Sequence, residues 1–167
     1  MPDGSAELVK IADAITAELA TEQQAGQFVD LEAFTPVRSW ADWKDDLEEL
    51  NELKVDVVGL SYDQCTLDTR DSVEYLCTSH IGIRRWFPQS QTEIGGRIKR
   101  DRIDRLIYFV QELNELFCRE NGRRLANYPD ATWDETKILT TFNRKYLRDK
   151  RMFFGLLKVG YKVSVTL

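Results

Sequence analysis

Few residues of this chain have the types and spacing that catalysis or metal binding requires. The single histidine, His80, has no second histidine or cysteine at metal-ligand spacing, so we interpret it as solvent-facing or locally hydrogen-bonded. The paired carboxylates Asp45 and Asp46, and Glu48 and Glu49, lack the alternating oxygen ligands of a calcium loop and indicate a solvated helix face. The sequence has no nucleophile elbow, phosphate-binding loop or dinucleotide fingerprint. We therefore expect a protein that is not an enzyme and that uses no cofactor and no metal.

One segment combines positive charge with aromatic rings. Trp86 and Phe87 are flanked by Arg84, Arg85, Arg97, Lys99, Arg100, Arg102 and Arg105. Cations interleaved with aromatic side chains can bind a nucleic-acid strand by ion pairing and stacking. A pI of about 5.0 and the acidic first half of the chain count against this, because they repel phosphate. The residues alone leave three alternatives open: nucleic-acid binding, a solvated surface, or contact with an acidic surface on a neighbouring copy.

The two halves of the chain carry opposite charge. Residues 1–83 hold 5 Lys and Arg against 18 Asp and Glu, whereas residues 84–167 hold 18 against 10. Two copies can therefore meet with an acidic surface against a basic one. This distribution favours self-assembly over catalysis.

Length and composition are typical of one globular domain. The chain has 167 residues, 43% of them hydrophobic and 31% charged, and it contains no apolar run of the roughly 20 residues that span a bilayer. Three cysteines without a CxxC spacing argue against a disulfide framework and a zinc site. We expect a single domain over residues 1–167, with a flexible loop at about residues 88–99 that is rich in Pro, Ser, Gln and Gly.

Hydrophobic periodicity predicts the elements that position these residues. Helices are expected at about 5–20, 42–51 and 101–120, and strands at 29–37, 53–59, 73–87, 136–143 and 153–165, with a long turn over 60–71. The order of elements lacks the regular strand–helix alternation of a parallel sheet. We therefore predict an α+β fold with a mainly antiparallel sheet of about five strands and helices packed on one face.

The arrangement resembles the tail terminator (tail completion) proteins of long-tailed, lambda-type bacteriophages. The resemblance lies in LVKIADAITAEL, QFVDLEAFTPV, DLEELNELKVDVVGL, EYLCTSHIGIRRW and the closing MFFGLLKVGYKVSV, and it spans nearly the whole chain. It is a likeness of element order and hydrophobic pattern, without a catalytic signature.

This resemblance implies a structural role. Proteins of this family form a ring, typically a hexamer, on the last ring of the tail tube, where they stop tube polymerisation and provide the head–tail joining surface. The implied partners are other copies of the chain, the tail tube protein and a neck or head completion protein, with DNA only as passing cargo and no membrane. The implied location is the head-proximal end of the virion tail, after assembly in the host cytoplasm.

Subunit-interface candidates follow from the resemblance together with the charge split. An acidic set of Asp42, Asp45, Asp46 and Glu49 is expected to face a basic set of Arg97, Lys99, Arg100 and Arg102 on the adjacent protomer. Another head–tail connector or neck completion protein is the nearest alternative, and a nucleic-acid-binding module is a more distant one.

Overall fold

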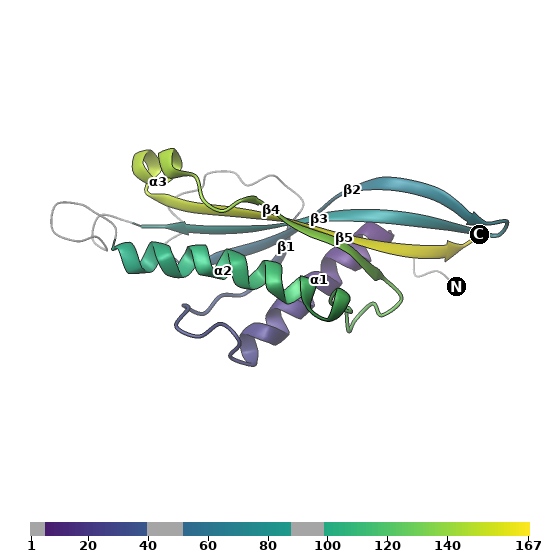
Figure 1. The fold of residues 1–167 in the computed structure, drawn as a ribbon, viewed down its shortest axis with the longest axis horizontal. Helices are drawn as coiled ribbons and strands as arrows, with labels where there is room; N and C mark the ends of the chain where they lie inside the picture. The colour runs from purple at the N-terminus through teal and green to yellow at the C-terminus, as the bar shows by residue number, and fades with distance from the viewer. Residues whose placement is uncertain (1–5, 40–51, 88–98) are drawn as a thin grey trace.

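The computed structural model describes residues 6–39, 52–87 and 99–167, and it has the predicted α+β architecture (Figure 1). The sheet has five strands in the order β1-β2-β3-β5-β4. They are β1 (Val37–Ser39), β2 (Lys54–Thr69), β3 (Ser72–Trp86), β4 (Thr132–Thr140) and β5 (Met152–Thr166). The helices are α1 (Glu7–Gln24), α2 (Arg100–Cys118) and α3 (Arg144–Lys150), with a 3-10 turn at Arg119–Asn121.

Three long antiparallel strands form the centre of the sheet. β3 pairs with β2 on one side and with β5 on the other, in a ladder that runs without a break from Ser72↔Thr166 to Trp86↔Met152. β4 pairs antiparallel to β5, whereas the short β1 runs parallel to β2, so the sheet is mixed. The predicted mainly antiparallel sheet is thus confirmed.

Alternation along β3 and β5 decides where the core lies. Cys77, Ile81 and Ile83 of β3 and Leu157 and Tyr161 of β5 point to the same face and are fully buried. α1 and α2 lie together on this face (Figure 1). The close approach of α2 depends on Gly155, because a Cβ there would come within 2.8 Å of Val110 Cγ2. α3 contacts β5 at the end of the sheet opposite the β2–β3 turn.

The strand predicted at residues 29–37 is wrong, apart from its last residue. Asp30 has a left-handed backbone with φ 60°, and only Val37–Ser39 pair with a neighbouring strand. Phe34 is buried in this segment, while Val29 is 67% exposed. Phe34 lies 5.3 Å from the ring of Phe109 on α2. Packing against a helix, and not pairing in a sheet, therefore determines the conformation of this segment.

The long turn predicted over residues 60–71 is also wrong, because β2 continues to Thr69 and only two residues separate it from β3. The register shifts between Gly59 and Ser61, between Tyr62 and Gln64, and between Leu67 and Thr69. Each irregularity breaks the period of two that identifies a strand in a sequence. The strand expected at 136–143 is observed earlier, at Thr132–Thr140, and the acidic helix expected at 42–51 lies outside the described residues.

The loop after α2 is held against α1 by a buried carboxylate. Glu18, only 5% exposed, accepts hydrogen bonds from the backbone N–H of Ala126 at 2.6 Å and from Arg123 Nε at 2.7 Å. The Arg123 Nη2 atom also lies 2.6 Å from Glu22 Oε1, and the Arg123 carbonyl accepts a 2.6 Å bond from Tyr161. The loop after α2 is thus fixed to the domain itself at Arg123 and Ala126.

Replacing Glu18 tests this anchor. Glu18→Ala leaves the Arg123 guanidinium and the Ala126 N–H without their carboxylate, so we expect a loss of about 2 kcal/mol in the free energy of unfolding. Urea denaturation measures the loss. Asp13→Ala on the exposed side of α1 is the matched control, and its ion pair with Arg38 should contribute less than about 1 kcal/mol. Equal losses in the two variants would contradict the assigned role of Glu18.

Candidate functional site

The structure describes three of the eight predicted interface residues. Lys99 immediately precedes α2, and Arg100 and Arg102 lie in its first turn. Lys99 and Arg100 are exposed, with side chains on the surface of the protein. The other candidates, Arg97, Asp42, Asp45, Asp46 and Glu49, lie outside the described residues. The pairing of the two charged sets between protomers therefore stays a prediction.

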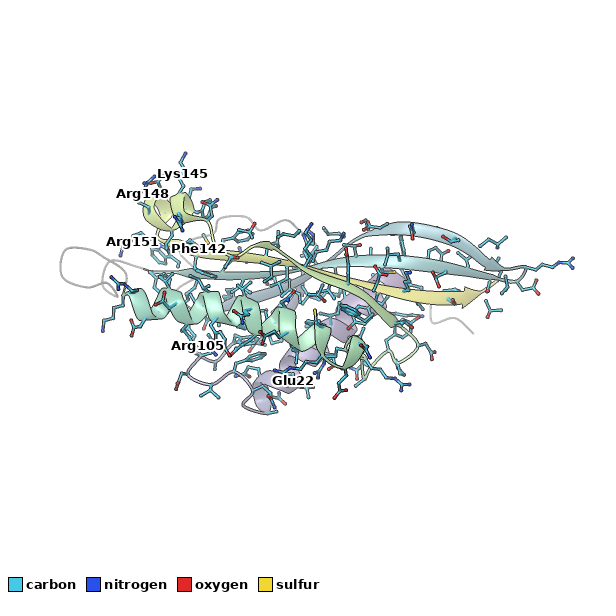
Figure 2. All side chains as sticks on the ribbon, viewed as in Figure 1. Glu22, Arg105, Phe142, Lys145, Arg148 and Arg151 are labelled. Atoms are coloured by element: carbon cyan, nitrogen blue, oxygen red, sulfur yellow. The ribbon has the colours of Figure 1, made fainter. Side chains whose placement is uncertain are left out.

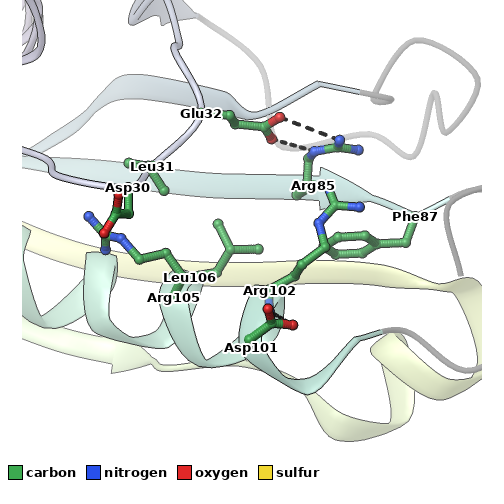
Figure 3. Close-up of a pocket in the computed structure, with 9 residues that line it drawn as sticks. All are labelled: Asp30, Leu31, Glu32, Arg85, Phe87, Asp101, Arg102, Arg105 and Leu106. Carbon is green, nitrogen blue, oxygen red and sulfur yellow. Dashed lines mark hydrogen bonds and ion pairs between the residues drawn. The ribbon is translucent and has the colours of Figure 1, made fainter. Parts of the chain in front are cut away.

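Arg102 is part of a cluster built around Phe87 (Figure 3). Its guanidinium carbon lies 4.8 Å from the centre of the Phe87 ring, and that of Arg85 lies 5.2 Å from the same centre. Arg85 is 4% exposed and is neutralised by Glu32, to which its Nε and Nη2 both donate. Because Phe87 is itself only 1% exposed, it supports the two cations and offers no free face for stacking on a base.

A shallow pocket of about 430 Å³ opens beside this cluster. Its walls carry Arg85, Arg102 and Arg105 but also Asp30, Glu32 and Asp101, so positive and negative groups balance. Arg105 is already occupied, because it donates to the Val29 carbonyl at 2.9 Å and to Glu112 at 3.2 Å. The charges that line the pocket thus neutralise one another where α2 meets residues 30–32, and they leave no excess charge to bind a charged small ligand.

Four further cations lie at the same end of the molecule, on α3, which the sequence analysis missed (Figure 2). They are Arg144, Lys145, Arg148 and Lys150. Arg151, which follows α3, is joined to Phe87 by two hydrogen bonds of 2.8 Å, from the Phe87 N–H to the Arg151 carbonyl and from Arg151 Nε to the Phe87 carbonyl. α3 and the first turn of α2 thus lie on either side of Phe87 at one end of the sheet, and we call their residues, 99–102 and 144–151, the basic end.

A recognisable signal for α3 was present in the sequence. Asn143 caps the helix by accepting a 3.0 Å hydrogen bond from the Tyr146 N–H, and Arg151 ends it in a left-handed conformation with φ 55°. Asparagine is among the preferred N-cap residues. With only seven residues, however, α3 has too few positions for a hydrophobic period to identify it.

The opposite end of the sheet exposes apolar side chains. We call residues 60–75 and 163–167 the sheet tip, where β2, β3 and β5 extend beyond both helices (Figure 1). α1 begins directly over it, since the Leu8 N–H donates to the Tyr62 hydroxyl at 3.2 Å. Leu67 and Leu167 are 66% and 74% exposed, and Leu60 and Tyr62 are also exposed.

One face of the sheet tip continues the buried face of the core. The ladder pairs Tyr62 with Cys77, Cys65 with Tyr75, and Leu67 with Val73. Because Cys77 faces α1 and α2, the residues of these pairs lie on the same side of the sheet, and Cys65 and Leu67 lie past Tyr62, where α1 begins. The sheet tip is therefore a core-like apolar face without a covering layer of its own among the described residues.

We next consider the described side chains that could take part in catalysis or metal binding. The described residues contain no cluster of three or more His, Cys, Asp and Glu side chains that could hold a metal ion. Burial, with a smaller contribution from the negative charge of Glu7, raises the pKa of the Cys77 thiol to about 12. No helix within the described ranges has the length and apolar character needed to cross a membrane.

Thiol labelling tests this assignment of the cysteines. At pH 7.5 the exposed Cys65 should react rapidly with a thiol reagent such as DTNB, while Cys77 should react only after unfolding, because its thiol is buried and its pKa is raised. Cys65→Ser should remove the rapid phase. Rapid labelling of Cys77 in the folded protein would contradict the buried placement of β3.

Substitution of Phe87 tests the cation cluster. Phe87→Leu keeps an apolar side chain but removes the ring, and should cost about 1 kcal/mol, whereas Phe87→Ala also opens a cavity and should cost about 3–4 kcal/mol. Thermal and urea denaturation measure both losses. A Leu variant as stable as the wild type would show that the stacked guanidiniums contribute nothing.

Comparison with known proteins does not assign this chain to a family. No model of a known protein family matches its sequence, and no curated protein matches it. The two surfaces at the ends of the sheet are therefore interpreted from their own geometry and chemistry.

Proposed function

We propose that this protein is a structural subunit that assembles into a ring and caps the tail tube of a long-tailed phage. In this role it terminates tail polymerisation and presents the surface to which the head or neck joins. The proposal combines the resemblance to tail terminators with the presence of two unlike surfaces on one elongated sheet. It assigns the protein no catalytic activity and no cofactor.

The observation that carries the proposal is the uncovered apolar face of the sheet tip. Burial of apolar area contributes roughly 25 cal/mol per Å², so a face of this kind is stabilised when another protein surface covers it. Leu67 lies on this face and pairs with Val73, and Tyr62 lies at its inner edge and pairs with Cys77. A second copy of the chain is the partner that a ring requires.

Unlike ends favour a closed ring over a two-fold dimer. In a ring, one patch of a subunit contacts a different patch on the next, and closure limits growth. Here the apolar sheet tip and the basic end lie at opposite ends of the sheet (Figures 1 and 2). Each exposed ion pair contributes only about 0–1 kcal/mol, so apolar contact is expected to hold the ring while charge orients the subunits.

The proposed partners besides further copies are the tail tube protein and a neck or head completion protein. The proposed location is the head-proximal end of the virion tail, following assembly in the host cytoplasm. A different connector or neck component that also forms a ring is the alternative, and capping of purified tail tubes distinguishes the two. A terminator binds the open end of the tube, whereas a neck component requires the terminator first.

A charge placed in the sheet tip tests the assembly surface. Leu67→Asp should leave the domain folded, since Leu67 is 66% exposed, and should abolish or strongly weaken self-association and tube capping. Sedimentation velocity and electron microscopy of tube ends provide the two measurements, with purified tail tubes present in both because some rings close only on their template.

Leu139→Asp is the matched control, because Leu139 is an exposed leucine on β4, away from the sheet tip. It should assemble like the wild type. If Leu67→Asp assembles normally as well, the sheet tip is not the contact surface; if neither the wild type nor the control assembles or caps tubes, the ring proposal itself fails.

A further inference from the structure

We infer that the basic end is a binding surface for the phosphate backbone of duplex DNA. This goes beyond the proposed ring, in which DNA is only cargo. The inference depends mainly on Arg144, Lys145 and Arg148 on α3, and Lys99 and Arg100 at the start of α2 add charge at the same end of the molecule. None of the five has a carboxylate partner among the described residues, apart from Arg148 with its neighbour Asp149 at 3.3 Å.

The local charge contrasts with that of the chain. The basic end, residues 99–102 and 144–151, contains eight Lys and Arg against two Asp, whereas the whole chain carries a net charge of −5. Phe87 lies between the two groups of cations, because it is hydrogen-bonded to Arg151 after α3 and stacked against Arg102 of α2. Figure 2 shows Lys145 and Arg148 directed outward from α3, away from the sheet.

The positions of the cations on α3 are unfavourable for the helix itself. Arg148 and Lys150 lie in the last turn, where the helix dipole favours positive charge. Arg144 and Lys145 lie in the first turn, where the dipole disfavours it, and Arg144 and Arg148 are like charges at i,i+4 spacing. A seven-residue helix gains little from its own hydrogen bonds, so this charge pattern costs stability that a bound polyanion restores.

In the proposed ring the basic end contributes charge and no apolar contact, and its chemistry favours phosphate as the principal partner. Protein interfaces have an apolar centre, and none of the large apolar side chains exposed in the described part of the chain lies within the basic end. Binding to a nucleic-acid backbone requires only exposed cations, because it is driven by counterion release. The surface has those cations and lacks the apolar centre.

The aromatic residues favour a duplex over a single strand. Binding of a single strand normally adds stacking of bases on exposed rings. Phe87 is buried beneath two guanidiniums, and the ring of Phe142 is stacked on Phe153 at 6.3 Å. With these rings occupied, the basic end contacts the backbone alone, so we expect binding without sequence preference.

Fluorescence anisotropy with a labelled 30-bp duplex of arbitrary sequence tests the inference on the full chain. We expect a dissociation constant of about 10⁻⁶–10⁻⁴ M near physiological salt, and a slope of log K against log salt of about −3 to −5. The triple change Arg144→Glu, Lys145→Glu and Arg148→Glu should reduce the slope by about 3 and lower affinity at least tenfold. The changes at positions 144 and 145 suit the helix dipole in the first turn and offset the unfavourable change at position 148 in the last turn, so α3 should remain folded.

Two further triples separate the role of α3 from overall charge and from folding. Arg119→Glu, Arg124→Glu and Lys137→Glu change the net charge equally at exposed cations outside the basic end and the sheet tip, and should keep most of the binding and its slope. Arg144→Gln, Lys145→Gln and Arg148→Gln remove the charge without reversing it and should lose binding to a smaller extent. Circular dichroism confirms that each variant is folded.

Four results would overturn the inference. The first two are the absence of duplex binding at 50 mM salt and equal loss of binding in the α3 triple and the control triple. The third is binding of poly-glutamate as tight as that of a duplex of equal charge, which would assign the basic end to an acidic protein surface. The fourth is tighter binding of a single strand than of the duplex, which would contradict a contact with the backbone alone. Because Leu67 is unchanged in all these variants, failure here leaves the ring proposal to its own test.

Discussion

The central strands are longer than the helices that cover them, and this difference in length determines the character of both ends of the molecule. A 15-residue strand extends roughly 50 Å, whereas helices of 18 and 19 residues extend roughly 28 Å. The unbroken β3–β5 ladder makes the sheet too long for the helix layer, and α1 begins only over Tyr62. The apolar face beyond that point has no helix above it.

The same constraint separates the two surfaces of the protein. At one end of β3, alternation brings Cys65, Leu67 and Tyr75 to an uncovered apolar face. At the other end, Arg85 and Phe87 follow the same alternation but lie beneath α2, where Glu32 neutralises one guanidinium and Arg102 covers the ring. An elongated sheet thus presents chemically different ends, which is a property that head-to-tail assembly can use.

Within the covered part, charge is largely satisfied inside the domain. Arg123 is held between Glu18 and Glu22, Arg105 by Glu112, and Arg85 by Glu32. Much of the positive charge in the second half of the sequence therefore serves the fold. Among the exposed cations of the described residues, Lys99, Arg100, Arg144 and Lys145 lie at one end of the molecule and have no carboxylate partner there.

The fold class, both long helices and the strands β3 and β5 could be predicted from the sequence, because their periods of 3.6 and 2 persist over many residues. The sequence also singled out Lys99, Arg100 and Arg102 as interface candidates, and of these Lys99 and Arg100 are exposed. Tertiary contacts decide the path of β2, whose bulges erase its period, and of residues 29–36, whose Phe34 packs on a helix instead of pairing in a sheet. They also decide which cations are neutralised inside the domain, because the partners of Arg85 and Arg123 lie 53 and 105 residues away. The pattern of residues along a short segment contains no information about contacts across such separations. For that reason the sheet tip and the basic end could not be predicted from the sequence.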